Sequence, residues 1–121
     1  MEFLQTSSEF PFSAAVIHSG RILQAVLTGI PAGSDRPVRG GVIAELHEIF
    51  RQLDEILSLA KAKRTAVVSV ELYLQHVLRD IEAVNVAYRE YFGTHPPNRR
   101  AFGVDLQSGM MIEAAFVAEL S

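Results

Sequence analysis

The sequence contains no cysteine, so neither a disulfide framework nor a thiolate nucleophile is available to this protein. It also has no excess of positive charge. Eleven lysines and arginines stand against 14 aspartates and glutamates, which gives a formal net charge of -3. Binding to nucleic-acid phosphates requires a basic stripe, and none is present. We therefore expect no nucleic-acid partner.

Long apolar runs are also missing. No stretch approaches the roughly 18 consecutive apolar residues that predict a membrane span, and residues 1–5 lack the basic and apolar segments of a signal peptide. We expect a cytoplasmic protein that makes no membrane contact. The hydrophobic content of 49% is sufficient for one buried core, so residues 1–121 are expected to form a single domain.

Two common kinds of catalytic motif are absent as well. The four histidines lie at positions without the spacing of a zinc site: His18, His47, His76 and His95. We therefore expect no zinc site. No serine stands in a G-x-S-x-G setting, so serine nucleophile chemistry is not indicated.

The first half of the chain shows a change from strand-like to helical patterning. The apolar runs 13–18 and 22–30 are separated by residues 19–21 with a central glycine, which predicts a β-hairpin. Over residues 42–63 the apolar residues recur at intervals of three and four, which predicts a long amphipathic helix with Glu45 on a polar face.

Residues 65–74 alternate with a period of two, which predicts a strand. In strict alternation Val68 and Val70 point to one face and Val67 to the other. The preceding basic cluster, Lys61, Lys63 and Arg64, is expected beside the negative C-terminal end of the long helix.

The last third of the chain predicts a second helix and two more strands. The helix covers residues 81–92, with Asp80 as its N-cap and Gly93 as a left-handed stop. The strands are expected at 100–106 and 110–119. The resulting order, ββαβαββ, predicts an α+β fold in which both helices cover one face of a single sheet.

The second face of this sheet is too apolar to be left in water. In the last strand it carries Met111, Ala115 and Val117 beside Glu113. Two helices cannot cover both sides of the sheet, so we expect another copy of the chain to cover the second.

Residues 80–99, DIEAVNVAYREYFGTHPPNR, resemble the run DF-x-x-VN-x-x-Y-x-x-YF-x-x-x-PP-x-R of the RidA/YjgF family. The similarity covers nearly the whole chain, from the FPFS at residues 10–13 to the IEA at 112–114. It implies a chorismate-mutase-like fold and a homotrimer with ligand clefts between subunits. It also implies cofactor-free hydrolysis of enamines and imines of 2-amino acids to 2-keto acids and ammonia. Some members carry an endoribonuclease L-PSP label, which this acidic composition does not favour.

The resemblance also implies roles for individual residues. Arg99 matches the family's substrate-binding arginine, and a planar guanidinium suits a carboxylate because it presents two parallel donors. Backbone groups near Ala101 and Thr28 are implied to hold the amine or the water. The positions implied to contact substrate are Phe12, Leu27, Thr28, Asn85, Ala101, Met111 and Glu113.

Several of these positions depart from the family pattern. Phe12 stands where the family has a tyrosine and lacks its hydroxyl group, and Leu27 begins the stretch that matches an S-G-Q triplet. Met111 replaces the first of two alternate glutamates, the one that helps to position the attacking water, and Glu113 keeps the second. Carboxylate binding is therefore better supported than water activation.

Each polar candidate has a structural alternative. Arg99 could pair with a glutamate across a subunit boundary, Asn85 could tie its helix to a neighbouring loop, and Glu113 could form a salt bridge to Arg99 or Arg100. Three functions stay open: a deaminase for small imino acids, a non-catalytic carboxylate-binding or regulatory trimer, and a specialised deaminase for a larger or more apolar catabolic substrate.

Overall fold

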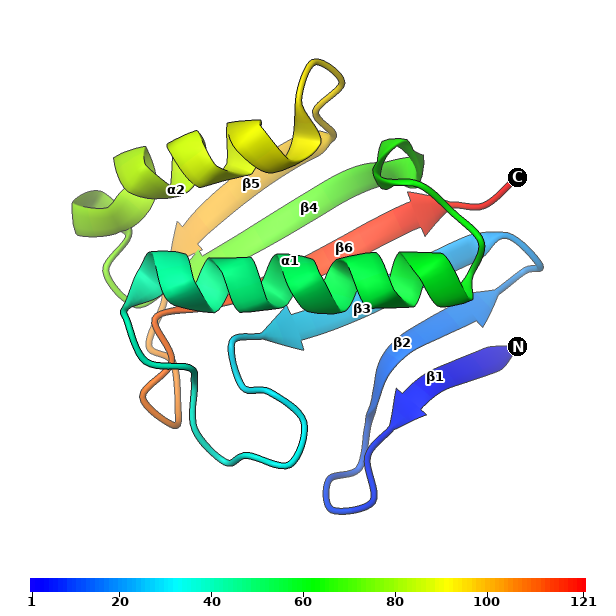
Figure 1. Cartoon of the computed structure of the whole chain (residues 1–121), viewed down its shortest axis with the longest axis horizontal. Coiled ribbons are helices and arrows are strands. Elements are labelled where there is room, and N and C mark those ends of the chain that lie inside the picture. The colour runs from blue at the N-terminus through cyan, green and yellow to red at the C-terminus, as the bar shows by residue number, and fades with distance from the viewer.

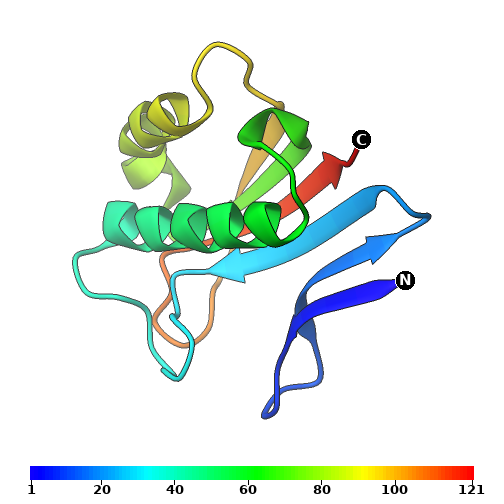
Figure 2. The ribbon, with the colours of Figure 1, turned by 45° about the vertical axis from the view of Figure 1, so that its right-hand side comes forward.

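One mixed sheet runs through the molecule, which a computed structural model describes over residues 1–121. The strand order is β1-β2-β3-β6-β4-β5, and only β4 and β5 are parallel. Both helices lie on the same side of the sheet (Figures 1 and 2), so the predicted α+β class is confirmed. The strands are β1 (Glu2–Thr6), β2 (Ser13–His18), β3 (Ile22–Thr28), β4 (Val67–Leu74), β5 (Asn98–Gly103) and β6 (Ile112–Glu119).

The predicted hairpin is formed by β2 and β3. Its turn places Ser19 and Gly20 at φ values of 54° and 76°, and the Arg21 N–H donates to the His18 carbonyl at 3.2 Å. Positive φ at both central residues matches the right-handed twist of the two strands. The first strand, β1, was not predicted, because it is an exposed edge strand in which only Leu4 is half-buried.

Helix α1 (Val42–Leu59) supplies the largest part of the core. Its apolar stripe packs on β3 and β6, and four of its side chains are wholly inaccessible to solvent: Leu46, Ile49, Leu53 and Ile56. The helix ends at Leu59, four residues earlier than predicted, because Lys61 adopts a left-handed φ of 57°. No basic residue therefore lies in its last turn, but Lys63 and Arg64 of the basic cluster line a cavity beside this end of the helix, where the cluster was expected.

Glu45 is the second exception to the predicted pattern of α1. We expected it on a polar face, yet it is only 3% exposed. The helix can approach β3 closely at this point because residue 29 is a glycine. A Cβ atom on Gly29 would lie 2.6 Å from the Cβ of Glu45, so the site admits no side chain.

Strand β4 follows a short 3₁₀ turn, η1 (Arg64–Ala66), and begins with an irregularity in its pairing with β6. The register shift between Val67 and Ser69 reverses the expected faces at the start of the strand. Val67 is buried and Val68 is 49% exposed, the opposite of strict alternation. A β-bulge of this kind inserts one residue and cannot be seen in a period-two pattern.

Helix α2 (Val77–Phe92) crosses over from β4 to β5. It begins at Val77, so the prediction of Asp80 as N-cap is wrong. Asp80 lies in the first turn, where its carboxylate accepts two bonds from Arg79 at 2.8 and 2.9 Å. The predicted stop is confirmed: Gly93 has a φ of 67°, and its N–H donates to the Arg89 carbonyl at 2.9 Å.

The face of the sheet opposite the helices is only partly covered. Val26 is 56% exposed, and Ala115 and Val117 are half-buried. Tyr73 and Phe102 stack here with ring centroids 5.7 Å apart. This face is as apolar as the alternation in β6 predicted. Neither helix combines the length and apolar character needed to cross a bilayer.

Candidate functional site

Arg99 is the second residue of β5 and faces helix α2. Strand β5 is parallel to β4, and Arg99 is the register partner of the buried Val70, which fixes the side of the sheet to which its side chain points. Its guanidinium carbon lies 4.8 Å from the centroid of the Tyr88 ring, a cation–π distance. Arg99 forms no ion pair with any carboxylate of the chain.

A cavity of about 360 Å³ lies between α2 and the start of β5. This volume falls in the range of roughly 300 to 1,000 Å³ that is usual for small-molecule sites. Arginine, asparagine and tyrosine residues line this cavity. The lining residues are Asn85, Tyr88, Arg89, Gly93, Pro96 and Arg99.

Two residues that line this cavity carry a buried polar atom without a hydrogen-bond partner, Asn85 Oδ1 and the Tyr88 hydroxyl. An unpaired buried group of this kind costs about 1 to 3 kcal/mol, so each marks a place where a ligand can supply the missing partner. Burial raises the pKa of Tyr88 to about 12, despite the opposing positive charge of Arg99. The hydroxyl is therefore protonated at neutral pH and available as a donor.

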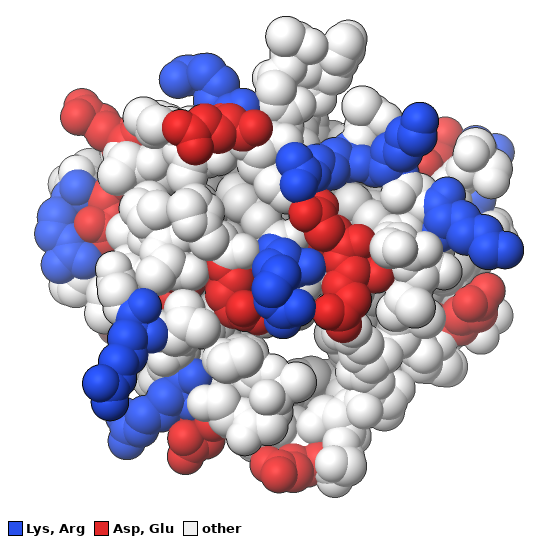
Figure 3. All heavy atoms as spheres, in the orientation of Figure 1, with Lys and Arg blue, Asp and Glu red and all other residues white.

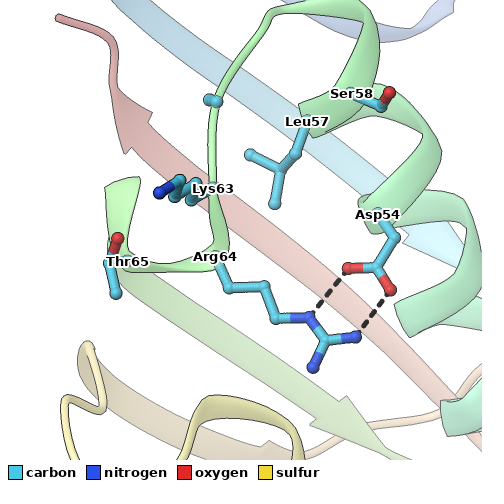
Figure 4. Close-up of a pocket in the computed structure, with 7 residues that line it drawn as sticks. Asp54, Leu57, Ser58, Lys63, Arg64 and Thr65 are labelled. Carbon is cyan, nitrogen blue, oxygen red and sulfur yellow. Dashed lines mark hydrogen bonds and ion pairs between the residues drawn. The ribbon is translucent and has the colours of Figure 1, made fainter.

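A second and larger cavity of about 500 Å³ lies at the C-terminal end of α1. Figure 4 shows the Arg64 guanidinium opposite the Asp54 carboxylate, joined by bonds of 3.0 and 2.8 Å. The Tyr91 hydroxyl also donates to Asp54, and the Arg64 guanidinium stacks 3.9 Å from the Tyr91 ring centroid. Because these groups already satisfy one another, we assign the candidate site to the smaller cavity.

Thr28 and Glu113 lie together near the middle of the sheet. They are register partners across β3 and β6. Burial raises the pKa of Glu113 above its ordinary value of 4.5. Glu113 forms no ion pair, so the salt bridge expected with Arg99 or Arg100 is absent within the chain. Arg100 instead approaches Glu71 on the exposed face, at 3.8 Å.

Met111 is held by its backbone just before β6. Its N–H donates to Glu45 Oε1 at 2.8 Å, and its sulfur lies 3.8 Å from Nη2 of Arg79. Burial raises the pKa of Glu45, although hydrogen bonds from the Met111 and Ile112 backbones pull the pKa in the other direction. The helical pattern of the sequence does not reveal this buried acid. The one available signal was Gly29, which permits the close approach.

The remaining predicted contacts are widely distributed. Phe12 is 62% exposed in the β1–β2 loop, where it stacks on Phe10 with centroids 5.8 Å apart. Leu27 is 2% exposed and belongs to the core. Ala101 is half-buried on β5 and shares the helix-facing side of that strand with Arg99.

One chain does not bring all of these residues together. Asn85, Arg99 and Ala101 surround the β5 edge, whereas Thr28 lies three strands away on β3. At about 4.8 Å per strand, this separation is about 14 Å. Phe12, in the loop before β2, lies at least four strands away, or about 19 Å.

The charged side chains on the helix-covered face of the molecule do not indicate a second binding site. Positive and negative side chains are interspersed over it, without a broad patch of one sign (Figure 3). No three histidine, aspartate or glutamate side chains are grouped so that they could hold a metal ion.

The fold and the site together define a small α+β protein with an arginine-lined cavity between its crossover helix and an edge strand. The family model described as Endoribonuclease L-PSP matches residues 5–120. The chain therefore belongs to this family, which is that of the RidA/YjgF proteins.

Individual relatives agree with this assignment. The 2-iminobutanoate/2-iminopropanoate deaminase of Homo sapiens is 33% identical over 109 residues, which cover 89% of this chain and 79% of the human protein. Two solved structures share the fold at 23% identity. A Thermotoga maritima protein has a TM-score of 0.88, covering 100% of this chain and 98% of that one. The Rid-family protein YyfA of Yersinia pestis has a TM-score of 0.87, with 98% of each chain covered.

Proposed function

We propose that this protein hydrolyses 2-imino acids, and the enamines with which they interconvert, to 2-keto acids and ammonia. The observation that carries the proposal is the Arg99 guanidinium, which has no carboxylate partner and faces a cavity with two unsatisfied buried polar atoms. The name of the human relative, an imine deaminase, supports the same class of reaction.

In the proposed complex, Arg99 binds the substrate carboxylate through two parallel N–H donors. The Tyr88 ring restrains the guanidinium from one side, so part of the ordering cost is met before the substrate binds. The Tyr88 hydroxyl and Asn85 Oδ1 then offer one donor and one acceptor to the rest of the substrate.

The chemical step requires no redox change. The oxygen of a water molecule adds to C2 of the imine, and the electrons of the C=N π bond move to nitrogen. The resulting carbinolamine loses ammonia as the C–N bond breaks, and the C=O bond of the keto acid forms. The two protons of the water end on the departing nitrogen. Imines of this type hydrolyse without help, so positioning the water and the substrate is enough to accelerate the reaction.

We further propose that the active assembly is a homotrimer with the cleft between subunits. This proposal is supported by the distance, within one chain, between the residues at the β5 edge and the residues Thr28 and Phe12. The partly uncovered apolar face of the sheet, with Val26 more than half exposed, supports association in the same way.

Water activation in this proposal does not involve Met111, because a thioether neither donates nor accepts a proton at neutral pH. Glu113 is the carboxylate that remains near Thr28. It has no ion pair, and burial raises its pKa, which moves it toward the range useful for acid–base work at neutral pH. Within one chain Glu113 lies on the face of the sheet opposite Arg99, so we assign the task of orienting the water to Glu113 of the partner subunit in the proposed trimer.

The test uses 2-imino acids generated in place by an amino-acid oxidase in the presence of catalase and semicarbazide. Semicarbazide traps the imine, and enzymatic hydrolysis lowers the yield of semicarbazone. The wild type and Arg51→Ala should both lower it, and Arg99→Ala should not. Arg51 is a matched control because it removes one guanidinium from the exposed side of α1, where it pairs with Glu48 and Glu55. Equal activity in Arg99→Ala and the wild type would refute the proposal.

A second candidate is a non-catalytic trimer that binds small carboxylates. The methionine at position 111 favours it, because the family's water-positioning acid is absent there. Calorimetric titration with 2-keto acids separates the two functions. Saturable binding that depends on Arg99, without any change in semicarbazone yield, would support the second candidate and exclude the first.

A further inference from the structure

The candidate cavity contains a second arginine that the proposed reaction leaves unused. Arg89, in the last turn of α2, lines the cavity together with Arg99. Neither guanidinium takes part in an ion pair of the chain, unlike those of Arg21, Arg51, Arg64, Arg79 and Arg100. The two other arginines without an ion pair, Arg36 and Arg39, lie in the exposed loop between β3 and α1 and do not line the cavity. No acidic residue lines this cavity, so its two positive charges are not balanced from within.

The position of Arg89 has a partial structural explanation. A cation in the last turn interacts favourably with the negative end of the helix, but this effect needs no cavity and no second arginine. It also leaves unexplained why two guanidinium groups without ion pairs line the same cavity as Asn85 and Tyr88, the two residues with an unpaired buried atom.

The four groups together describe the ligand. Two guanidinium groups bind two carboxylates, and the Tyr88 hydroxyl donates to an acceptor. Asn85 Oδ1 requires an N–H donor. An inorganic phosphate could satisfy the cations but offers no N–H group to Asn85. A monocarboxylic imino acid would satisfy Asn85 but leave one cation without a partner.

We propose that the site prefers 2-imino acids whose side chain ends in a second carboxylate. This inference rests on the proposed function. Arg99 binds the carboxylate next to the imine carbon, and Arg89 binds the distal carboxylate. Arg89 thus determines specificity without touching the reacting atoms. The cavity volume of about 360 Å³ leaves room for a five-carbon dicarboxylate.

The test compares two five-carbon substrates that differ only in the distal group. L-Glutamate oxidase generates 2-iminoglutarate, and an L-amino-acid oxidase generates 2-iminopentanoate from norvaline. We expect wild-type kcat/KM to favour 2-iminoglutarate by about tenfold, the effect of one partly exposed charge-assisted contact. Arg89→Gln should remove this preference and leave kcat/KM for 2-iminopentanoate within about twofold, Arg89→Lys should retain part of it, and Arg51→Gln should behave as the wild type.

Equal kcat/KM for the two substrates in the wild type would overturn the inference, and so would an equal loss on both in Arg89→Gln. Absence of turnover on both imines would refute the proposed function. The preference for a second carboxylate would then be tested by comparing binding affinities. Calorimetric titration would compare 2-oxoglutarate with 2-oxopentanoate. Tighter binding of 2-oxoglutarate that disappears in Arg89→Gln supports the preference, whereas equal binding of the two acids overturns it.

Discussion

Replacement of Glu45 tests the contact that holds the start of β6 and, through it, the position of Met111. Glu45→Ala removes the acceptor for the backbone N–H groups of Met111 and Ile112. Glu45→Gln keeps an acceptor oxygen and nearly the same volume, but has no charge. The two variants therefore separate the hydrogen bond from the buried charge.

The expected magnitudes follow from the burial of the side chain. Glu45 is 3% exposed, and leaving a buried donor unsatisfied costs about 1 to 3 kcal/mol. Two donors lose their partner in Glu45→Ala, while removal of a desolvated charge returns part of the loss. We expect a net decrease in the free energy of unfolding of about 2 to 3 kcal/mol. At about 4 °C per kcal/mol, the melting temperature should fall by about 8 to 12 °C. Glu45→Gln should change the free energy of unfolding by less than about 1 kcal/mol.

Thermal and urea unfolding followed by circular dichroism, at one fixed protein concentration, would measure these differences. If Glu45→Gln lost as much stability as Glu45→Ala, the negative charge would be the stabilising feature and the reasoning from the hydrogen bond would be refuted. An unchanged free energy of unfolding in Glu45→Ala would also refute the reasoning, because the backbone N–H groups would then need no acceptor.

The pH dependence of the same variants provides an independent check. Burial raises the folded-state pKa of Glu45 above 4.5, so the folded protein binds this proton more tightly than the unfolded chain does. The contribution of Glu45 to stability therefore increases as the pH falls through the folded-state pKa toward 4.5. Glu45→Gln lacks this gain. Its free energy of unfolding relative to the wild type should be higher at pH 7 than at pH 4.

Three other substitutions test further contacts. Gly29→Ala should cost about 1 to 3 kcal/mol in unfolding experiments, because its Cβ would overlap Glu45; an unchanged melting temperature would contradict this. Burial raises the pKa of Asp54, but the hydrogen bonds from Arg64 and Tyr91 outweigh burial and lower this pKa overall. The contribution of Asp54 to the free energy of unfolding is therefore lost as the pH falls through the lowered pKa. Acid titration of Asp54→Asn should lack this loss. Tyr88→Phe removes an unpaired hydroxyl, so we expect an unchanged or slightly higher melting temperature but weaker 2-keto acid binding by calorimetry; unchanged affinity would show that the hydroxyl meets no ligand.

The sequence was sufficient to predict the fold class because its apolar periodicities are strong. The stripe of α1 and the alternation in β6 both match the observed burial. The failures occurred where tertiary contacts override a local pattern. The bulge at Val67 is a mismatch between two strands, and β1 is an edge strand without a buried face. Neither feature has a periodicity of its own.

The candidate site was predictable in part. The position of Arg99 at the start of a strand followed from the glycine and proline residues before it. The neighbouring roles of Tyr88 and Arg89 were missed, because a helical pattern shows which side chains share a face but not which polar atoms lack a partner. Glu45 was assigned to the polar face for the same reason. Its burial depends on Gly29, which lies on a different element.

The crossover from β4 through α2 to β5 has one more consequence. Every residue that lines the candidate cavity lies between Asn85 and Arg99, within this single supersecondary unit, and none lies on β1, β2, β3 or β6. Specificity can therefore diverge among related proteins through a few substitutions in this one short segment, while the strands that would hold subunits together stay unchanged. The same segment could be exchanged between relatives as a cassette.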